Sequence, residues 1–361
     1  MKKTLVAMAV LAASGAAMAQ SSVTLFGVLD AGIGHYTADG QAGVTKIESS
    51  GLSSSRLGFK GVEDLGGGSY ADFWLEAGIT PGSGAGAATN TSNTSAGATT
   101  GNGLTFNRRS TVGLGGSWGE LRIGRDYTPD VVSKLIFDPF GANGVGEALN
   151  LSINSGGSAS VRASNGVSYL YGFDQNSYPF TGNNVYFQGT VAKGGTAGTS
   201  DGDYQGARLG YAAGPVNVAV ATGQTKLASV GNAKTNNIGA SYDFGVASLI
   251  LAYNTNKNGN NSLNNKETTV GTAIPVGAGT FKLAYNHISG TGTGDSGSAT
   301  QFSAGYVYAL SKRSSLYTTF ATLSNSGGGK FTFAANSPYY AGAPTANGKT
   351  QGFEVGFKQS F

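Results

Sequence analysis

The C-terminal stretch Gln351–Phe361 reads QGFEVGFKQSF and alternates between apolar and polar side chains up to a terminal aromatic residue. Phe353, Val355 and Phe357 share one face with Phe361, while glycine, glutamate, lysine and serine occupy the positions between them. Successive side chains of a β-strand point to opposite faces, so a period of two predicts a strand. One face of this strand suits an apolar environment and the other suits an aqueous one.

Segments with the same alternation recur along the whole chain from Val23 onward. Short turns such as 64–68 and 213–215 alternate with long polar connections such as 81–103 and 325–349. Short turns at one rim and long loops at the other are the plan of a transmembrane antiparallel β-barrel. The pattern therefore predicts an all-β barrel of about sixteen strands, near residues 23–30, 56–60, 71–77, 104–114, 120–126, 167–173, 185–191, 204–213, 216–226, 236–244, 246–256, 268–276, 280–288, 301–310, 314–323 and 351–361.

The composition agrees with an apolar surface that is dispersed along the chain. Charged residues make up 12% of the sequence and glycine contributes 60 of its 361 residues, whereas about 25% and about 7% are usual. No apolar run in the body of the chain reaches the roughly 20 residues that a spanning helix needs. The chain has no cysteine, which excludes disulfides and thiolate metal sites, and its net charge of +4 includes no basic run for nucleic acid.

The N-terminus carries the features of a secretory signal. Lys2 and Lys3 precede a short apolar stretch at 5–13, and Ala17-Met18-Ala19 matches an A-x-A cleavage site. The apolar stretch is too short to span a membrane as a helix. We therefore expect a signal peptide at residues 1–19 and a single barrel domain at residues 20–361.

Charged residues on the predicted inward face indicate a wet interior. Asp30, Arg56, Lys60, Asp72 and Glu76 fall on the polar side of neighbouring predicted strands. Burying these charges in a dry core would be costly, whereas a water-filled lumen accepts them. A sheet in the bilayer must also close on itself, because no water is present to pair with edge backbone groups. These positions favour an aqueous channel over a soluble sandwich.

The connection between Arg125 and Arg162 differs from the others. It contains apolar and aromatic residues, as in Phe137-Asp138-Pro139-Phe140, in place of low-complexity filler. Long connections in compact folds are usually functional or disordered. We expect this connection, the third long loop, to fold into the lumen and narrow it. The alternative is a surface loop with a small core of its own.

Basic residues gather on the strands around this connection and predict a positively charged sector of wall. Adjacent strands lie about 4.8 Å apart, so arginines on successive strands can meet. Acidic residues on the connection would face them across a narrow gap and create a strong local field. The alternative is that several of these arginines pair with carboxylates or lie near the lipid headgroups. The predicted constriction comprises Arg56, Lys60, Arg108, Arg109, Arg125 and Arg162 on the wall, with Asp130, Asp138 and Glu147 on the connection. Side chains alternate between the two faces of a strand, and this parity places Arg109, and not Arg108, on the inner face.

The chain resembles the general porins of β-proteobacteria, which are trimeric sixteen-stranded outer-membrane diffusion channels. The resemblance covers the mature chain and is carried by the stretches SVTLFGVLD at 22–30, SRLGFKGVEDLGGG at 55–68, FNRRSTVGL at 106–114, GRDYTP at 124–129 and FDPF at 137–140. It implies passive diffusion of small hydrophilic solutes and ions across the outer membrane of a Gram-negative bacterium. It also implies a homotrimer in contact with lipid and lipopolysaccharide, and no cofactor.

The resemblance also assigns residues. Arg56, Arg108 and Arg162 match the arginines that line the constriction of anion-selective members, which implies a preference for anions. Phe361 matches the terminal aromatic that the barrel assembly machinery reads. Two stretches depart from the family pattern: the proline after Asn165–Tyr169 comes late, in 177–182, and the family's R-H-x-F ending is KQSF here.

Three other functions remain as alternatives. An outer-membrane enzyme would need a serine or a carboxylate beside a histidine, or two carboxylates, held in reach of each other. The only histidines of the sequence are His35 and His287, both near predicted strand ends. A closed adhesin barrel would need a packed lumen, against which the inward charges argue. A substrate-specific sugar channel would need an aromatic stripe in the lumen, and inward Phe26 and Trp74 are too few. We therefore expect no catalytic residues and no bound metal.

Overall fold

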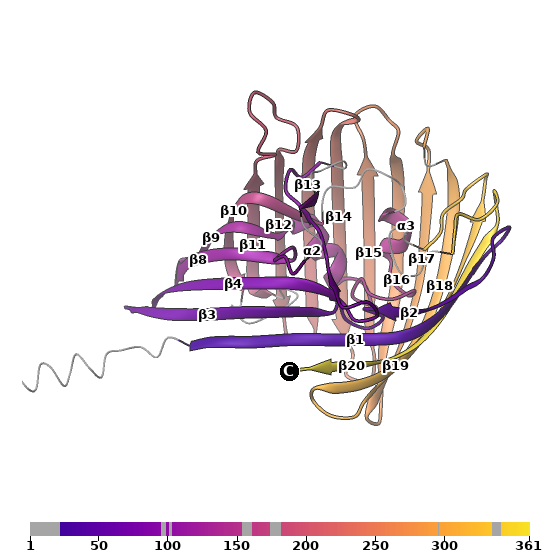
Figure 1. Cartoon of the computed structure of the whole chain (residues 1–361), viewed down its shortest axis with the longest axis horizontal. Helices are drawn as coiled ribbons and strands as arrows, with labels where there is room; N and C mark the ends of the chain where they lie inside the picture. The colour runs from indigo at the N-terminus through magenta and orange to yellow at the C-terminus, as the bar shows by residue number, and fades with distance from the viewer. Residues whose placement is uncertain are drawn as a thin grey trace, which may run out of the picture.

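The computed structural model describes residues 22–94, 99–100, 103–153, 161–173, 182–294, 296–333 and 341–361. Within these residues, sixteen strands form a closed antiparallel barrel, in agreement with the number expected from the sequence (Figure 1). They are β1 (Ser22–Ala38), β3 (Arg56–Gly66), β4 (Ser69–Thr80), β8 (Arg109–Gly116), β9 (Gly119–Tyr127), β10 (Arg162–Phe173), β11 (Gly182–Ala192), β12 (Tyr204–Ala213), β13 (Val216–Leu227), β14 (Gly231–Asp243), β15 (Ser248–Lys257), β16 (Asn264–Val276), β17 (Gly279–Gly290), β18 (Gly297–Ala309), β19 (Ser314–Ser326) and β20 (Lys349–Ser360).

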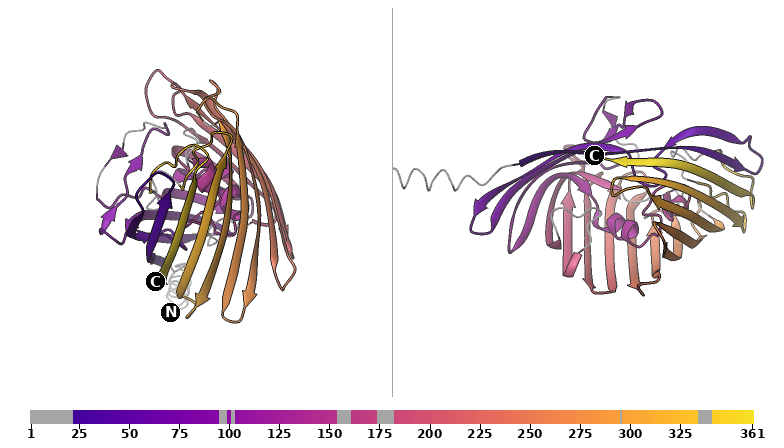
Figure 2. Two further views of the ribbon diagram at one scale, coloured as in Figure 1. Left: turned by 90° about the vertical axis from the view of Figure 1, so that its right-hand side faces the viewer. Right: turned by 90° about the horizontal axis from the view of Figure 1, so that it is seen from below.

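The first and last strands close the barrel. β20 pairs with β1 in antiparallel register, with Ala31 opposite Phe357, and Figure 2 shows these two strands side by side. The terminal residue continues this pairing, because Phe361 N donates to Gly27 O at 3.1 Å and Gly27 N donates to Phe361 O at 3.0 Å. This pairing closes the sheet on itself, as a sheet in the bilayer requires.

The alternation of β20 separates an exposed face from a buried one, as its sequence predicts. Phe353, Val355 and Phe357 are 49%, 48% and 43% exposed, whereas Glu354 between them is fully buried. Large apolar side chains are exposed in the same way on other strands, for example Val220. Because an outward band of apolar residues meets lipid in a transmembrane barrel, the other face of each strand is the inner face.

Shorter elements lie in the connections. They are β2 (Val44–Ser49), β5 (Ala85–Gly86), β6 (Thr89–Asn90), β7 (Thr99–Thr100), α2 (Pro129–Ile136) and α3 (Leu149–Ile153). Proline suits the first position of α2, where no intrahelical donor is needed, and the acidic Asp130 suits its first turn. No helix among the described residues is long and apolar enough to cross a membrane.

One expected strand begins later than its sequence suggests. The alternation starts at Leu104, but β8 begins at Arg109. Asn107, which precedes β8, makes two other contacts. Its side-chain Oδ1 accepts a hydrogen bond from Gly78 N at 2.8 Å, and its backbone O accepts one from Arg125 Nε at 2.6 Å. These contacts with side chains take the place of strand pairing in the residues just before Arg109.

The segment 128–153, which contains α2 and α3, packs against the inner face of the strands. α2 contacts β11, β12, β13 and β14 (Figure 1). Glycines make room for the residues that follow it. A Cβ on Gly239 would lie 2.0 Å from Cδ2 of Phe137, and one on Gly271 would lie 2.0 Å from Cγ of Pro139. Glycines such as these therefore leave the space that this segment needs to pack against the barrel wall.

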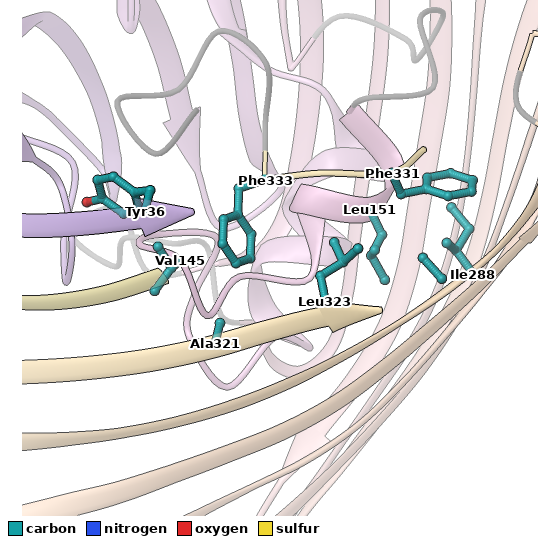
Figure 3. Packing of buried hydrophobic residues seen from close by; sticks show 9 residues of the cluster. Tyr36, Val145, Leu151, Ile288, Ala321, Leu323, Phe331 and Phe333 are labelled. Atoms are coloured by element: carbon teal, nitrogen blue, oxygen red, sulfur yellow. The ribbon is translucent and has the colours of Figure 1, made fainter. Parts of the chain in front are cut away.

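An apolar cluster joins this segment to the connection that follows β19 (Figure 3). Phe331 and Phe333 are 5% and 0% exposed and pack with Val145 and Leu151 of the segment. The cluster is completed by side chains from the barrel strands: Tyr36, Ile288, Ala299, Ala321 and Leu323. The sequence predicted 325–349 to be a polar loop. That prediction is wrong for Phe331 and Phe333, whose aromatic side chains find an apolar partner on segment 128–153.

Candidate functional site

Three arginines form a connected row on the inner face, which we call the arginine ladder: Arg56, Arg108 and Arg162. Oε1 of Glu76 lies 2.5 Å from Nε of Arg108 and 3.8 Å from Nε of Arg56. The hydroxyl of Tyr127 accepts hydrogen bonds from Nη2 of Arg108, at 3.2 Å, and from Nη2 of Arg162. The structure thus brings together the three arginines that the family resemblance selected.

The register of the strands places these residues at the same level along the barrel wall. Arg56 opens β3 and lies opposite Gly78 of β4, two residues after Glu76. Arg108 precedes the first residue of β8, and its backbone N donates to Glu76 O. Arg162 opens β10 and lies opposite Tyr127, the last residue of β9. Neighbouring strands are about 4.8 Å apart, so a row of side chains from β3 to β10 is a direct consequence of this register.

The ladder carries more positive than negative charge. Glu76 is the carboxylate in contact with two of its arginines, and the third stacks on an aromatic ring, with Cζ of Arg162 3.9 Å from the centre of the Tyr127 ring. Arginine stays protonated at all physiological pH values and is weakly hydrated. Such a row attracts anions and holds its charge in a fixed geometry.

Both members of the adjacent pair reach inward, which explains why parity and resemblance selected different residues. Arg109 lies within β8 and obeys strand parity, with its Nε 3.6 Å from Oδ2 of Asp126. Arg108 lies before the strand, so parity does not constrain it and its side chain reaches Glu76. The two arginines are 7% and 5% exposed, Arg108 being the more exposed.

A second group of charges adjoins the ladder on the same wall. Cζ of Arg109 and Nζ of Lys60 lie 4.4 Å and 4.8 Å from the centre of the Trp74 ring. Arg122 binds two carboxylates, with Nε 2.6 Å from Oε1 of Glu120 and Nη1 2.7 Å from Oδ2 of Asp126. Carboxylates therefore offset more of the positive charge in this group than Glu76 offsets in the ladder.

Arg125 has a different role from the one predicted. It was expected in the constriction, but its guanidinium donates to Asn107 O at 2.6 Å, Asn90 O at 2.9 Å and Ser164 Oγ at 2.7 Å. Arg125 lies two residues after the exposed Ile123, so the alternation of β9 places both side chains on the same face. Arg125 therefore fastens Asn90 and Asn107, which precede β8, to the barrel by binding their backbone carbonyls.

The acidic residues of segment 128–153 position the segment itself. Oδ1 of Asp130 accepts from the Tyr204 hydroxyl at 2.6 Å, on β12. The Asp138 carboxylate accepts from the backbone N of Phe140, Ala142 and Ala148 at 2.9, 3.1 and 2.9 Å. The predicted opposition of these acids to the arginines is replaced by contacts with β12 and within the segment.

Glu147 is the third of these acids and is 8% exposed. Its carbonyl accepts a hydrogen bond from Nε2 of Gln301 at 3.0 Å, which places it beside β18. Burial raises the pKa of the Glu147 carboxyl to about 8, and the nearby charge of Asp138 acts in the same direction. Burial disfavours the charged form of a carboxyl, so Glu147 is largely neutral at neutral pH.

Two residues that contact the ladder, Glu76 and Tyr127, were missing from the predicted site. Glu76 was expected on the inward face, but nothing in the sequence indicated that it would lie between two arginines. Tyr127 lies in the conspicuous GRDYTP stretch at 124–129, yet its contact with two arginines depends on the pairing of β9 with β10. Among the described residues, no group of three or more histidine, aspartate or glutamate side chains is arranged to hold a metal ion.

Comparison with known proteins gives this geometry its context. The Gram-negative porin family model matches residues 4–328. The chain is 36% identical to outer membrane porin protein 32 of Delftia acidovorans over the full length of both, and 31% identical to an outer membrane porin protein of Bordetella pertussis over 88% of this chain and 93% of that protein. The anion-selective porin from Comamonas acidovorans superposes with a TM-score of 0.79 at 31% identity, covering 95% of this chain and all of that chain. The protein therefore belongs to the Gram-negative porins, the passive diffusion channels of the bacterial outer membrane.

Proposed function

We propose that this porin conducts small hydrophilic solutes and ions with a preference for anions, and that the arginine ladder is the site of that preference. The observation that carries the proposal is the charge balance of the ladder, in which Glu76 contacts two arginines and the third stacks on Tyr127. A ring of fixed charge of one sign selects ions of the opposite sign in a pore. The comparison supports it, since the Comamonas porin is described as anion-selective.

Segment 128–153 completes the constriction in this proposal. A sixteen-stranded barrel encloses a wide aqueous lumen, which an inward loop narrows. The packing of α2 on the inner face of β12, β13 and β14 supports this placement. So does the hydrogen bond between Ser54 Oγ, two residues before Arg56, and Asn143 Oδ1 of the segment at 3.0 Å. The ladder and the segment would then be opposite borders of the narrowest passage.

Export and assembly are part of the same proposal. Residues 1–19 would be removed as a signal peptide, leaving residues 20–361 as the barrel. The terminal Phe361, which pairs with Gly27, would be read by the barrel assembly machinery. We infer a homotrimer in lipid and lipopolysaccharide, as the family resemblance implies; OmpT of Vibrio cholerae, which shares the fold at 14% identity, is described in a trimer form.

The reversal potential of the purified porin in a planar bilayer under a KCl gradient tests the proposed selectivity. We expect the sign that corresponds to faster passage of chloride than of potassium. A reversal potential on the potassium side would overturn the preference for anions while leaving the diffusion channel itself intact.

A further inference from the structure

The outer face of the neighbouring strands β8, β9 and β10 changes from apolar to polar at one level of the barrel (Figure 1). The apolar row consists of exposed side chains that lie opposite one another in the strand register: Val112, Ile123 and Val167. The outward positions that follow, toward the long connections, are Ser110, Arg125 and Asn165. Outward apolar residues of a transmembrane barrel meet hydrocarbon, and its long loops are extracellular. The polar row therefore lies at the level of the headgroups of the outer leaflet.

A recess of about 610 Å³ opens on the outer face at this level, and Ser110 and Arg125 both line it. Pockets that hold small molecules have volumes of about 300–1,000 Å³. Two glycines that lie opposite each other in the register, Gly124 and Gly166, also line the recess and leave it open. Gly124 has a φ of +129°, and a Cβ on it would lie 2.0 Å from the carbonyl oxygen of Ser110, so no other residue fits there.

The guanidinium of Arg125 is held in place with one nitrogen left over. Its Nε donates to Asn107 O, and its Nη1 donates to Asn90 O and Ser164 Oγ. A guanidinium has five N–H donors, of which two belong to Nη2. Among the described residues, Nη2 of Arg125 has no hydrogen-bond acceptor. The recess thus contains a fixed arginine that can still donate to a ligand.

The positive charge of Arg125 has no carboxylate in direct contact. None of the salt bridges between the described residues includes Arg125. Residues 77–119, which contain the whole connection before β8, include neither aspartate nor glutamate. The neighbouring charges that act on Arg125 are Arg162 and Asp126. Asp126 is engaged elsewhere, because its Oδ2 lies 2.7 Å from Nη1 of Arg122. The recess therefore favours an anion.

We propose that this recess, the lipid recess, binds a phosphate group of lipopolysaccharide, with Arg125 Nη2 and the Ser110 hydroxyl as donors. Lipid A, the membrane anchor of lipopolysaccharide, carries its phosphates directly above its acyl chains. The polar row lies directly above the apolar row in the same way, so one lipid molecule contacts both. Arginine suits phosphate because its planar guanidinium is always charged and weakly hydrated. The site rests on the proposed contact of this porin with lipopolysaccharide and is independent of the selectivity of the channel.

The site also joins the lipid to the connection before β8. The guanidinium that donates to the phosphate is the one that binds the backbone carbonyls of Asn90 and Asn107. A hydrogen bond to a charged partner is stronger than one between neutral groups. The bound phosphate therefore holds Arg125 in the orientation that fastens this connection to the barrel.

Binding of bisphosphorylated lipid A to the purified, folded porin in detergent, measured by native mass spectrometry, tests the lipid recess. Dephosphorylated lipid A, which keeps the acyl chains, is the second probe. We expect the wild type to bind the bisphosphorylated form about fivefold more tightly, the effect typical of one basic residue at an anionic lipid surface. Arg125→Gln should lose this preference. Arg313→Gln, which removes an exposed charge from the turn between β18 and β19, should keep it.

Ser110→Asp separates lipid binding from the structural role of Arg125. Ser110 lies opposite Arg125 in the register, so the new carboxylate pairs with the guanidinium and repels a phosphate. The hydrogen bonds of Nε and Nη1 can remain. Ser110→Asn, which has the same size and no charge, is the matched control. We expect the aspartate variant to lose the preference for phosphorylated lipid and the asparagine variant to keep it. Heat-modifiable electrophoretic mobility shows that each variant is folded.

The outcomes distinguish the site from the contact on which it rests. If the wild type binds phosphorylated lipid A more tightly and Ser110→Asp and Arg125→Gln do so equally, the contact stands and the lipid recess is wrong. If the wild type binds neither form of lipid A, the contact itself is overturned. If the wild type shows no preference and Ser110→Asp instead weakens the association of subunits, a second copy of the chain covers the recess and the proposal fails.

Discussion

Arg108 and Glu76 are joined through Nε and Oε1 at 2.5 Å, and the same carboxylate oxygen lies 3.8 Å from Nε of Arg56. One negative charge thus orients two positive charges that would otherwise repel each other. Nε1 of Trp74 donates to the other oxygen of Glu76 at 3.1 Å, which fixes the carboxylate in turn. Glu76 therefore both organises the ladder and weakens its field.

Glu76→Gln should increase the preference for anions. Removing one charge at about 4 Å changes an ion's energy by about 1 kcal/mol in water, which corresponds to a several-fold change in permeability ratio at low salt. The single amide oxygen of the variant can accept from Nε of Arg108, while its amide nitrogen then faces Nε1 of Trp74 and that hydrogen bond is lost. The reversal potential in a KCl gradient measures the effect. A shift toward potassium would mean that the arginines lose their arrangement without the carboxylate.

Neutralising the ladder should weaken the preference for anions. The variant Arg56→Gln, Arg108→Gln, Arg162→Gln removes three positive charges, and its reversal potential should move toward the unselective value. Arg313→Gln is the control, because it removes an exposed positive charge in the turn between β18 and β19, outside the ladder. Equal shifts in the two variants would contradict the assignment of selectivity to the ladder.

The same charge argument predicts a dependence on ionic strength. Screening shortens the range of electrostatic interactions from about 10 Å at 0.1 M to about 3 Å at 1 M salt. The reversal potential at a fixed concentration ratio should therefore approach the unselective value as the total concentration rises. A preference that stays constant over this range would indicate selection by size and not by the field of the ladder.

The barrel could be predicted from the sequence because its rule is local. In Gln351–Phe361, apolar and polar side chains alternate because one face of the strand meets lipid and the other faces inward. The exposure of Phe353 and the burial of Glu354 follow this alternation. The row Arg56, Arg108, Arg162 was selected by resemblance. Strand parity missed Arg108, because parity applies only within a strand and Arg108 lies one residue before β8.

The connections could not be predicted in the same way, because their contacts join residues far apart in the chain. Phe331 and Phe333 meet Val145 and Leu151 almost two hundred positions away, and no local pattern marks the pair. Arg125 resembles its neighbours in the sequence, yet backbone carbonyls of another connection bind it. Contacts between residues so far apart in the chain can be identified only after the pairing register of the strands is known.

The apolar cluster should stabilise the folded connections. Phe333→Ala removes a fully buried aromatic side chain, and large-to-small substitutions of this kind cost about 3–5 kcal/mol. We expect a lower midpoint of thermal unfolding and noisier single-channel currents. Phe353→Ala on β20 is the matched control, because Phe353 is 49% exposed on the outer face and should lose less stability in detergent. Equal losses in both variants would show that Phe333 does not anchor the connection.

Glu147 should make the stability of the folded segment depend on pH. Its carboxyl has a pKa of about 8 in the folded protein against a usual value of 4.5. A raised folded pKa contributes stability that is complete below the usual value and is lost as pH rises through the folded value, at about 1.4 kcal/mol for each pH unit within the window. The midpoint of thermal unfolding should therefore fall between about pH 4.5 and pH 8. Glu147→Gln, which cannot ionise, should flatten this part of the profile, whereas an unchanged slope in the variant would assign the pH dependence to other groups.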